Sequence, residues 1–301
     1  DCTSGCDQTL TFNNKQNTFD DKKDVYCVSG TYTGGGITMR DEVTVRLCGT
    51  GTIPTINMGD KSTLEIIDGA NVTVQNLNLN SDADEIIIHV GGSLTITNTF
   101  SPNEKIENDG TLNLAALNLN SGAEIKNNGT VNITANSGTT VMNGKFKNYG
   151  TTVINNSLGV NNGSDVENKC SFEVKGDMLV NDDFKNESFV KVGGLTNVNG
   201  GAEIELKDGA MWLTTDLSIN GKIDGKDETS LFKVLDKSNG NSGAQIKGNI
   251  AFCDVNGNEF PSWANIIKSG VSEDCDFVVP TSDCNPEGRS VTPSAISCNK
   301  T

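Results

Sequence analysis

One short motif decides the fold, because the chain repeats it six times in register: Ile106-Glu107-Asn108, Ile125-Lys126-Asn127, Phe146-Lys147-Asn148, Val166-Glu167-Asn168, Phe184-Lys185-Asn186 and Ile204-Glu205-Leu206. Successive copies lie 18 to 21 residues apart, and each is followed by a turn and a short alternating strand, as in Asn128-Gly129-Thr130-Val131-Asn132-Ile133. Short strands at a period of ~20 residues, with no helical segment between them, are typical of a solenoid. One such unit cannot bury its own apolar face and must stack on its neighbours, so the sequence predicts a parallel β-helix.

The predicted fold class is all-β, a single-stranded parallel β-helix of about ten turns with a right-handed coil as the default. Changes in composition divide the chain into three parts. Residues 1–52 form an N-terminal cap and first turn, residues 53–250 form the solenoid, and residues 251–301 form a C-terminal cap or tail with four cysteines and four of the six prolines. We expect disulfide-tied caps at both ends, because uncapped end turns expose strand edges and an open core.

Composition excludes several classes of function. The formal net charge of −16 argues against binding to nucleic acid or to an anionic membrane through bulk charge. The chain contains no run of 18 apolar residues, so we expect no membrane insertion. The hydrophobic content of 35% suits the thin core of a solenoid, and the 33 glycines suit a chain that turns every few residues.

Nine cysteines, most of them near the two ends, favour an oxidising compartment in which cysteine pairs form stabilising disulfides. Cys27 and Cys48 lie 21 residues apart, about one turn, and we predict that they bond to each other across adjacent strands. Cys170 stands alone among the regular turns, so it is either free or bonded to a partner from outside. The candidates for structural disulfides are Cys2, Cys6, Cys27, Cys48, Cys253, Cys275, Cys284 and Cys298.

The asparagine of the motif is predicted to stack in a ladder, in which each side-chain amide donates to the next and to backbone groups at the corner. The charged residue before it changes sign at most steps, as from Glu107 to Lys126, and is predicted to face solvent. Each exposed pair of this kind contributes about 0–1 kcal/mol. The ladder residues are Asn108, Asn127, Asn148, Asn168 and Asn186.

Residues that commonly carry catalysis are scarce. His89 is the only histidine, and we align it with the exposed position of Glu107 and Lys126 and interpret it as a surface residue. Acidic clusters fall at turns, where aspartate usually serves the turn itself. These clusters are Asp82/Asp84/Glu85 and Asp182/Asp183. We therefore assign no catalytic residue and predict that the chain is not an enzyme.

Residues 254–259 resemble the start of a calcium loop, because residues with side-chain oxygens occupy alternate positions along them. The glycine at the sixth position and the distant bidentate glutamate of such a loop are absent, which favours a plain turn. We expect no cofactor, with calcium as the one alternative. The candidate ligands are Asp254, Asn256, Asn258 and Glu259.

An ice-binding face requires a regular array of outward threonines on a flat side of the solenoid. Thr111, Thr130 and Thr151 align, and Ser93 and Ser171 fall near the same column. We interpret this column as single threonines without doubled Thr-x-Thr rows, which makes ice binding an alternative and not the leading hypothesis.

Two stretches resemble a known family: Tyr26-Cys27-Val28-Ser29-Gly30-Thr31-Tyr32 and Leu47-Cys48-Gly49-Thr50-Gly51-Thr52. The repeated units of the type Asn127-Asn128-Gly129-Thr130-Val131-Asn132-Ile133 add to the resemblance. They resemble secreted surface proteins of Bacteroidetes-type bacteria, over about residues 24–225. In that family such turns build long extracellular adhesins and filament-like proteins. The resemblance implies a β-helix at the cell surface.

These observations favour a non-catalytic extracellular protein, either an adhesin module or a subunit of a surface fibre. Its expected partners are other copies of itself or surface glycans and proteins. We interpret Asp1-Cys2 as the mature end left by signal-peptide removal, so the expected location is extracellular or at the cell surface. The alternatives are a β-helix lyase or hydrolase that acts on polysaccharide and an ice-binding protein.

Overall fold

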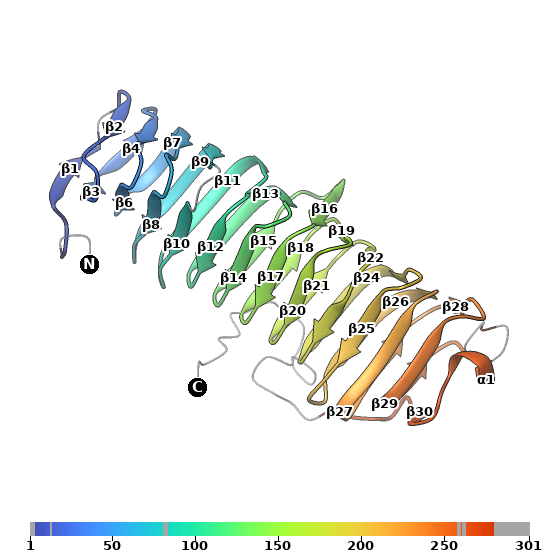
Figure 1. The fold of residues 1–301 in the computed structure, drawn as a ribbon. Helices are drawn as coiled ribbons and strands as arrows, with labels where there is room; N and C mark the ends of the chain where they lie inside the picture. Colours follow the sequence, from blue (N-terminus) through green and yellow to red (C-terminus); the bar gives the residue numbers. More distant parts are fainter. Residues whose placement is uncertain (1–3, 13, 81–83, 258–259, 261–262, 280–301) are drawn as a thin grey trace. The chain divides into compact units, whose positions relative to one another are not determined.

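The predicted parallel β-helix is confirmed. The computed structural model describes residues 4–12, 14–80, 84–257, 260 and 263–279. The chain forms a parallel β-solenoid of about 13 turns and divides into two compact units, Asp1–Thr134 (unit 1) and Ala135–Thr301 (unit 2). Within each unit the strands stack turn upon turn (Figure 1). They form three stacks of parallel strands, which we call face A, face B and face C in chain order.

In unit 1, face A consists of β1 (Gln8–Thr11), β3 (Val25–Ser29), β6 (Thr44–Leu47), β8 (Thr63–Ile66), β10 (Glu85–Ile88), β12 (Lys105–Asn108) and β14 (Glu124–Asn127). Face B consists of β4 (Thr31–Thr33), β7 (Thr50–Asn57), β9 (Asn71–Asn78), β11 (Ser93–Phe100), β13 (Thr111–Leu119) and β15 (Thr130–Ile133). Face C contains β2 (Asn17–Phe19), β5 (Ile37–Met39) and the second halves of the four long strands of face B.

In unit 2, face A consists of β17 (Lys145–Asn148), β20 (Asp165–Asn168), β23 (Phe184–Asn186), β25 (Glu203–Leu206) and the first halves of β27 (Lys222–Val234) and β29 (Gln245–Asp254). Face B consists of β18 (Thr151–Ile154), β21 (Ser171–Val174), β24 (Phe189–Val198), β26 (Met211–Ile219), the second halves of β27 and β29, and β30 (Val271–Glu273). Face C contains β16 (Thr139–Met142), β19 (Ser157–Val160), β22 (Met178–Val180), β28 (Ser238–Gly240) and the second halves of β24 and β26. The helix α1 spans Trp263–Ile266.

The core is a column filled by the inward side chain of every second strand residue. Ile106 lies opposite Ile125, and both are buried. In unit 2 the column becomes aromatic, with ring centroids 5.2 to 6.1 Å apart. Such ring pairs contribute about 0.5–1.5 kcal/mol beyond the area they bury. The stacked residues are Phe146, Phe172, Phe184, Trp212, Phe232 and Phe252.

The turn between face A and face B brings successive glycines into close approach. A Cβ atom added to Gly129 would lie 2.1 Å from the carbonyl oxygen of Gly110, and one added to Gly110 would lie 2.3 Å from that of Gly92. A side chain is therefore excluded at these positions, which explains the glycines of Asp109-Gly110-Thr111 and Asn128-Gly129-Thr130.

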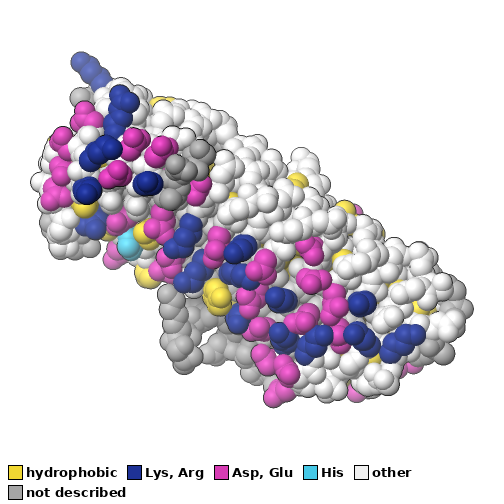
Figure 2. Space-filling model, in the orientation of Figure 1, with side chains coloured by type: hydrophobic (Ala, Val, Ile, Leu, Met, Phe, Trp, Pro, Cys, Tyr) yellow, Lys and Arg dark blue, Asp and Glu magenta, His cyan; other side chains and the backbone are white. Residues whose placement is uncertain are grey.

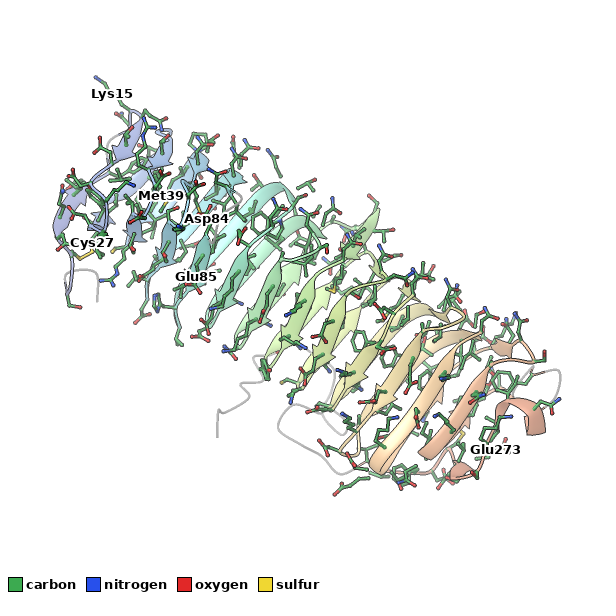
Figure 3. The ribbon with its side chains drawn as sticks, viewed as in Figure 1. Lys15, Cys27, Met39, Asp84, Glu85 and Glu273 are labelled. Atoms are coloured by element: carbon green, nitrogen blue, oxygen red, sulfur yellow. A yellow bond between two sulfur atoms is a disulfide. The ribbon has the colours of Figure 1, made fainter. Side chains whose placement is uncertain are left out.

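The predicted Cys27–Cys48 disulfide is wrong. Cys27 bonds to Cys6, with their Cα atoms 5.8 Å apart, and the bond lies at the Cys27 label in Figure 3. The reason is the register of face A, which places Cys27 opposite Arg46, so that Cys48 falls two residues beyond the position one turn away. Cys48 and Cys170 also carry disulfides, so Cys170 is not a free thiol.

The second disulfide with both cysteines described joins Cys253 to Cys275, with their Cα atoms 4.6 Å apart. Three further candidates, Cys2, Cys284 and Cys298, lie outside the described residues. Parallel pairing extends beyond the predicted solenoid of residues 53–250, from β1 to β30, which accounts for turns beyond the ten expected. Among the described residues, no helix has the length and apolar character needed to span a membrane.

Candidate functional site

The asparagines of the predicted ladder end the strands of face A and are at most 1% exposed. In unit 1, Asn108 Nδ2 donates to Asn127 Oδ1 at 2.7 Å. In unit 2, Asn148 donates in the same way to Asn168 at 2.7 Å, and Asn168 donates to Asn186 at 2.8 Å. Each also donates to a backbone carbonyl at the start of face B, as Asn108 does to Thr130. The ladder therefore fixes the positions from which β15, β21 and β24 begin.

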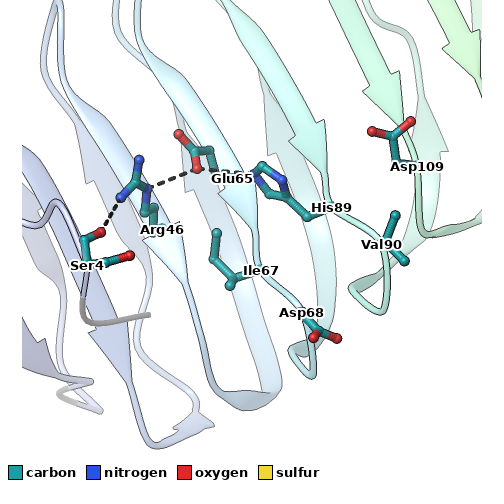
Figure 4. A pocket seen from close by; sticks show the side chains of 8 residues that line it. All are labelled: Ser4, Arg46, Glu65, Ile67, Asp68, His89, Val90 and Asp109. Atoms are coloured by element: carbon teal, nitrogen blue, oxygen red, sulfur yellow. Dashed lines mark hydrogen bonds and ion pairs between the residues drawn. The ribbon is translucent and has the colours of Figure 1, made fainter. Parts of the chain in front are cut away.

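A pocket of about 420 Å³ opens beside face A of unit 1 (Figure 4). Arg46 Nε donates to Glu65 Oε2 at 2.9 Å, and the same carboxylate oxygen lies 3.2 Å from His89 Nε2. Arg46 Nη1 also donates to the backbone oxygen of Ser4 at 2.9 Å. The guanidinium and the carboxylate therefore neutralise each other while they hold the N-terminal segment next to the Cys6 disulfide.

The predicted alignment of His89 with Glu107 is wrong by two residues. Face A pairs Ile87 with Glu107, so His89 follows the strand at the level of Asp109. Its side chain is 43% exposed, which agrees with its interpretation as a surface residue. Its contact with Glu65, on the preceding turn, is not visible in the sequence. The lining of the pocket thus comes from four consecutive turns and the N-terminal segment, and the side chains of Arg46 and His89 both already contact Glu65.

In the acidic clusters Glu85 forms an ion pair with Lys105 at 2.6 Å, whereas Asp84 and Asp182 accept hydrogen bonds from the backbone. Asp84 accepts hydrogen bonds from the backbone N–H groups of Asn80 at 2.8 Å and Ser62 at 3.2 Å, and burial raises its pKa. Asp182 accepts one from the backbone N–H of Gly163 at 2.5 Å. These carboxylates hold turns in place, as the sequence indicates for aspartate at such positions.

The candidate calcium ligands are only partly described. Asp254 accepts a hydrogen bond from the Ser238 hydroxyl, and Asn256 Nδ2 donates to Asp236 Oδ1 at 3.1 Å. Asn258 and Glu259, like Asp82 of the first acidic cluster, lie outside the described residues. Over the described part of the chain, no three His, Cys, Asp or Glu side chains are grouped to hold a metal ion. The calcium site stays a prediction.

Face A of unit 2 carries alternating charges that we call the charged ladder, defined by Lys147, Asp165, Glu167, Lys169 and Glu187. Lys147 Nζ lies 2.7 Å from Asp165 and 3.2 Å from Glu167, and Lys169 Nζ lies 3.1 Å from both Glu167 and Glu187. In Figure 2 the charged side chains of unit 2 gather in a band in which the two signs lie side by side. Oppositely charged side chains of the charged ladder therefore attract each other from one turn to the next.

The pKa values in the charged ladder show this mutual stabilisation. Burial alone would raise the pKa of Glu167, but hydrogen bonds from Lys169 and Lys147 leave it below its ordinary value. The pKa of Lys169 is raised, first by its hydrogen bond to Glu187. Because the charges neutralise one another, the ladder leaves little unbalanced charge for a partner to bind.

Face B of unit 1 has a different surface. At the first and third position of each strand the side chain points outward, and none of these side chains is charged or buried. Eight of the twelve are threonine. We call this surface the threonine face and define it by Thr31, Thr33, Thr50, Thr52, Asn71, Thr73, Ser93, Thr95, Thr111, Asn113, Thr130 and Asn132.

The column of Thr111 and Thr130 holds single threonines as expected, since Asn113 and Asn132 lie beside them, but doubled rows occur earlier in unit 1. Thr31 and Thr33 pair with Thr50 and Thr52 on the next turn, which makes two doubled rows. Sequence reasoning missed them because they lie in the segment interpreted as a cap. The sequences Thr31-Tyr32-Thr33 and Thr50-Gly51-Thr52 are the signal that would have found them. In unit 2 the surface differs, since face B pairs outward Val153 with Glu173.

Comparison with known proteins gives no relative: no family model, no curated protein and no solved structure matches the chain.

Proposed function

We propose that the chain is a non-catalytic extracellular adhesive module, and that the threonine face is its binding surface for an uncharged, regularly repeating partner. The observation that carries this proposal is the contrast between two faces. On face A the charged side chains pair with each other, as Lys126 pairs with Glu107 at 3.1 Å. On the threonine face the outward side chains are neutral hydrogen-bonding groups repeated from turn to turn.

Rigidity supports this use of the surface. Asn132 Nδ2 donates to Asn113 Oδ1 at 2.9 Å, and Asn113 Nδ2 donates to Thr95 Oγ1 at 3.3 Å, so outward side chains are held across consecutive strands. The strands beneath them are fixed by parallel pairing from turn to turn, and Asn108 also holds the start of β15 through the backbone oxygen of Thr130. A surface ordered before binding loses little conformational entropy when it meets a partner.

An extracellular location is part of the proposal. The disulfides Cys6–Cys27 and Cys253–Cys275 are compatible with an oxidising compartment. The net charge of −16 keeps such a protein soluble and repels other acidic molecules, which suits a binding surface that is itself uncharged.

Adsorption to uncharged solids tests the proposal. The purified chain is incubated with insoluble cellulose, chitin, uncharged agarose and ice, and the bound fraction is measured. We expect adsorption to at least one solid, loss of adsorption in Thr52→Lys, and retention in the matched control Thr63→Lys. Thr63 points outward on face A of the same unit, between Thr44 and Glu85, so this control adds the same charge elsewhere.

Two outcomes contradict the proposal. Adsorption to none of the solids removes the threonine face as a binding surface. Release of new reducing ends from the glycans, measured in the same supernatants, removes the non-catalytic part. Circular dichroism of both variants checks that each folds as the parent does.

A further inference from the structure

The threonine face repeats along two directions at once. Along each strand its outward side chains are two residues apart, ~6.7 Å, and from strand to strand they are ~4.8 Å apart. The register keeps the third-position column intact, since Thr52 pairs with Thr73 and Thr73 pairs with Thr95. It keeps the first-position column intact as well, since Asn71 pairs with both Thr50 and Ser93. The result is a two-dimensional grid of uncharged side chains. Water oxygens on the faces of ice parallel to its long axis repeat with a similar pair of spacings.

Threonine suits a partner made of ordered water. Its hydroxyl donates and accepts hydrogen bonds, and its methyl group is apolar and restricts the orientation of the adjacent water. A charged group would instead orient water around itself and disturb a tetrahedral lattice. The twelve outward positions of the threonine face include no charged residue, although the chain has 39 acidic and 23 basic residues.

The same surface is poorly suited to sugar rings. Proteins commonly grip a sugar by laying an exposed aromatic ring against its apolar face, and no aromatic residue is among the outward positions of the threonine face. Tyr32 lies between Thr31 and Thr33 but points inward and is 1% exposed, with its hydroxyl donating to the backbone oxygen of Val28 at 2.7 Å. The surface offers hydroxyl, methyl and amide groups and no stacking platform.

We propose that the partner of the threonine face is the ordered water lattice of ice. This inference rests on the proposed function and deepens it, because it names which uncharged repeating surface is bound. The doubled rows Thr31/Thr33 and Thr50/Thr52, with Thr73 and Thr95 on the next two strands, form the centre of the site.

The test measures thermal hysteresis and inhibition of ice recrystallisation with the full chain at micromolar concentration. We expect a measurable gap between melting and freezing and small, stable ice grains. Thr52→Lys is expected to abolish both effects, because a long charged side chain lifts the surface off the lattice. Thr63→Lys, on face A, is expected to keep both.

The outcomes separate this inference from the proposed function. No hysteresis, together with adsorption to cellulose or chitin that Thr52→Lys abolishes, overturns ice as the partner and leaves the adhesive module standing. No hysteresis and no adsorption to any solid overturns both. Equal loss of hysteresis in Thr52→Lys and Thr63→Lys overturns the assignment of the site to the threonine face.

Discussion

Asn168 donates a hydrogen bond from its Nδ2 to Oδ1 of Asn186 at 2.8 Å, and both side chains are completely buried. The same amide group donates to the backbone oxygen of Phe189 at 2.9 Å, and Asn168 Oδ1 accepts from Asn148 at 2.7 Å. One side chain thus satisfies polar groups on three consecutive turns. The stability of unit 2 depends on such residues as well as on its apolar column.

Replacing Asn168 with alanine should lower the free energy of unfolding by about 2–4 kcal/mol, because the change leaves several buried donors and acceptors without partners. Urea unfolding followed by circular dichroism measures the loss. Asn162→Ala, at an exposed turn of the same unit, is the control and should change stability by less than about 0.5 kcal/mol. Similar losses of unfolding free energy in the two variants would contradict a stabilising role of the buried asparagines.

Gly129→Ala should destabilise unit 1 by about 1–3 kcal/mol, because the new Cβ atom would lie 2.1 Å from the carbonyl oxygen of Gly110, and backbone cannot give way cheaply. The matched control is Gly200→Ala, where nothing lies within 4 Å of the added atom. Urea unfolding midpoints compare the two. A Gly129 variant as stable as the parent would show that successive turns are further apart than described.

The charged ladder predicts how stability depends on pH. The pKa values of Asp165 and Glu167 are lowered in the folded chain, so their contribution is complete above the ordinary values of 3.8 and 4.5 and is lost as pH falls through the lower folded values. The pKa of Lys147 is raised, so its contribution is complete below 10.5 and is lost as pH rises further. Between these limits the ladder contributes a constant amount.

Lys147→Met should therefore make the acid-induced loss of stability shallower, by removing a partner that both carboxylates share. The thermal midpoint measured from pH 3 to pH 7 tests this, and the effect at neutral pH is about 0–1 kcal/mol. Lys175→Met, at an exposed position, serves as the control and should leave the parent profile unchanged. An unaltered acid limb in Lys147→Met would contradict the assigned pairs.

The fold could be predicted from the sequence because the motif marks both strand and spacing. Ile106 and Ile125 lie opposite each other as their 19-residue separation requires, and Asn108 and Asn127 follow from the same register. The partner of Cys27 could not be predicted, because the local repeat is two residues shorter than the 21 that separate Cys27 from Cys48. A shift of one or two residues decides which side chains meet.

The candidate binding surface was harder to predict than the fold. Thr52 and Thr73 are 21 residues apart, whereas Thr95 and Asn113 are 18 apart, so the columns of the threonine face do not share one period in the sequence. Only strand pairing shows that Thr31, Thr50 and Ser93 belong to one column. The contact between His89 and Glu65 could not be predicted from the sequence for a similar reason, since it depends on how far each turn extends beyond its strand.

Adsorption of the parent chain, Thr52→Lys and Thr63→Lys to a panel of uncharged solids that includes ice tests the central claim most directly. If the neutral grid on unit 1 is the binding surface, the parent and Thr63→Lys adsorb to at least one solid and Thr52→Lys remains in solution. If Thr52→Lys adsorbs as strongly as the parent, or if the parent adsorbs to none of the solids, the surface has been assigned the wrong role.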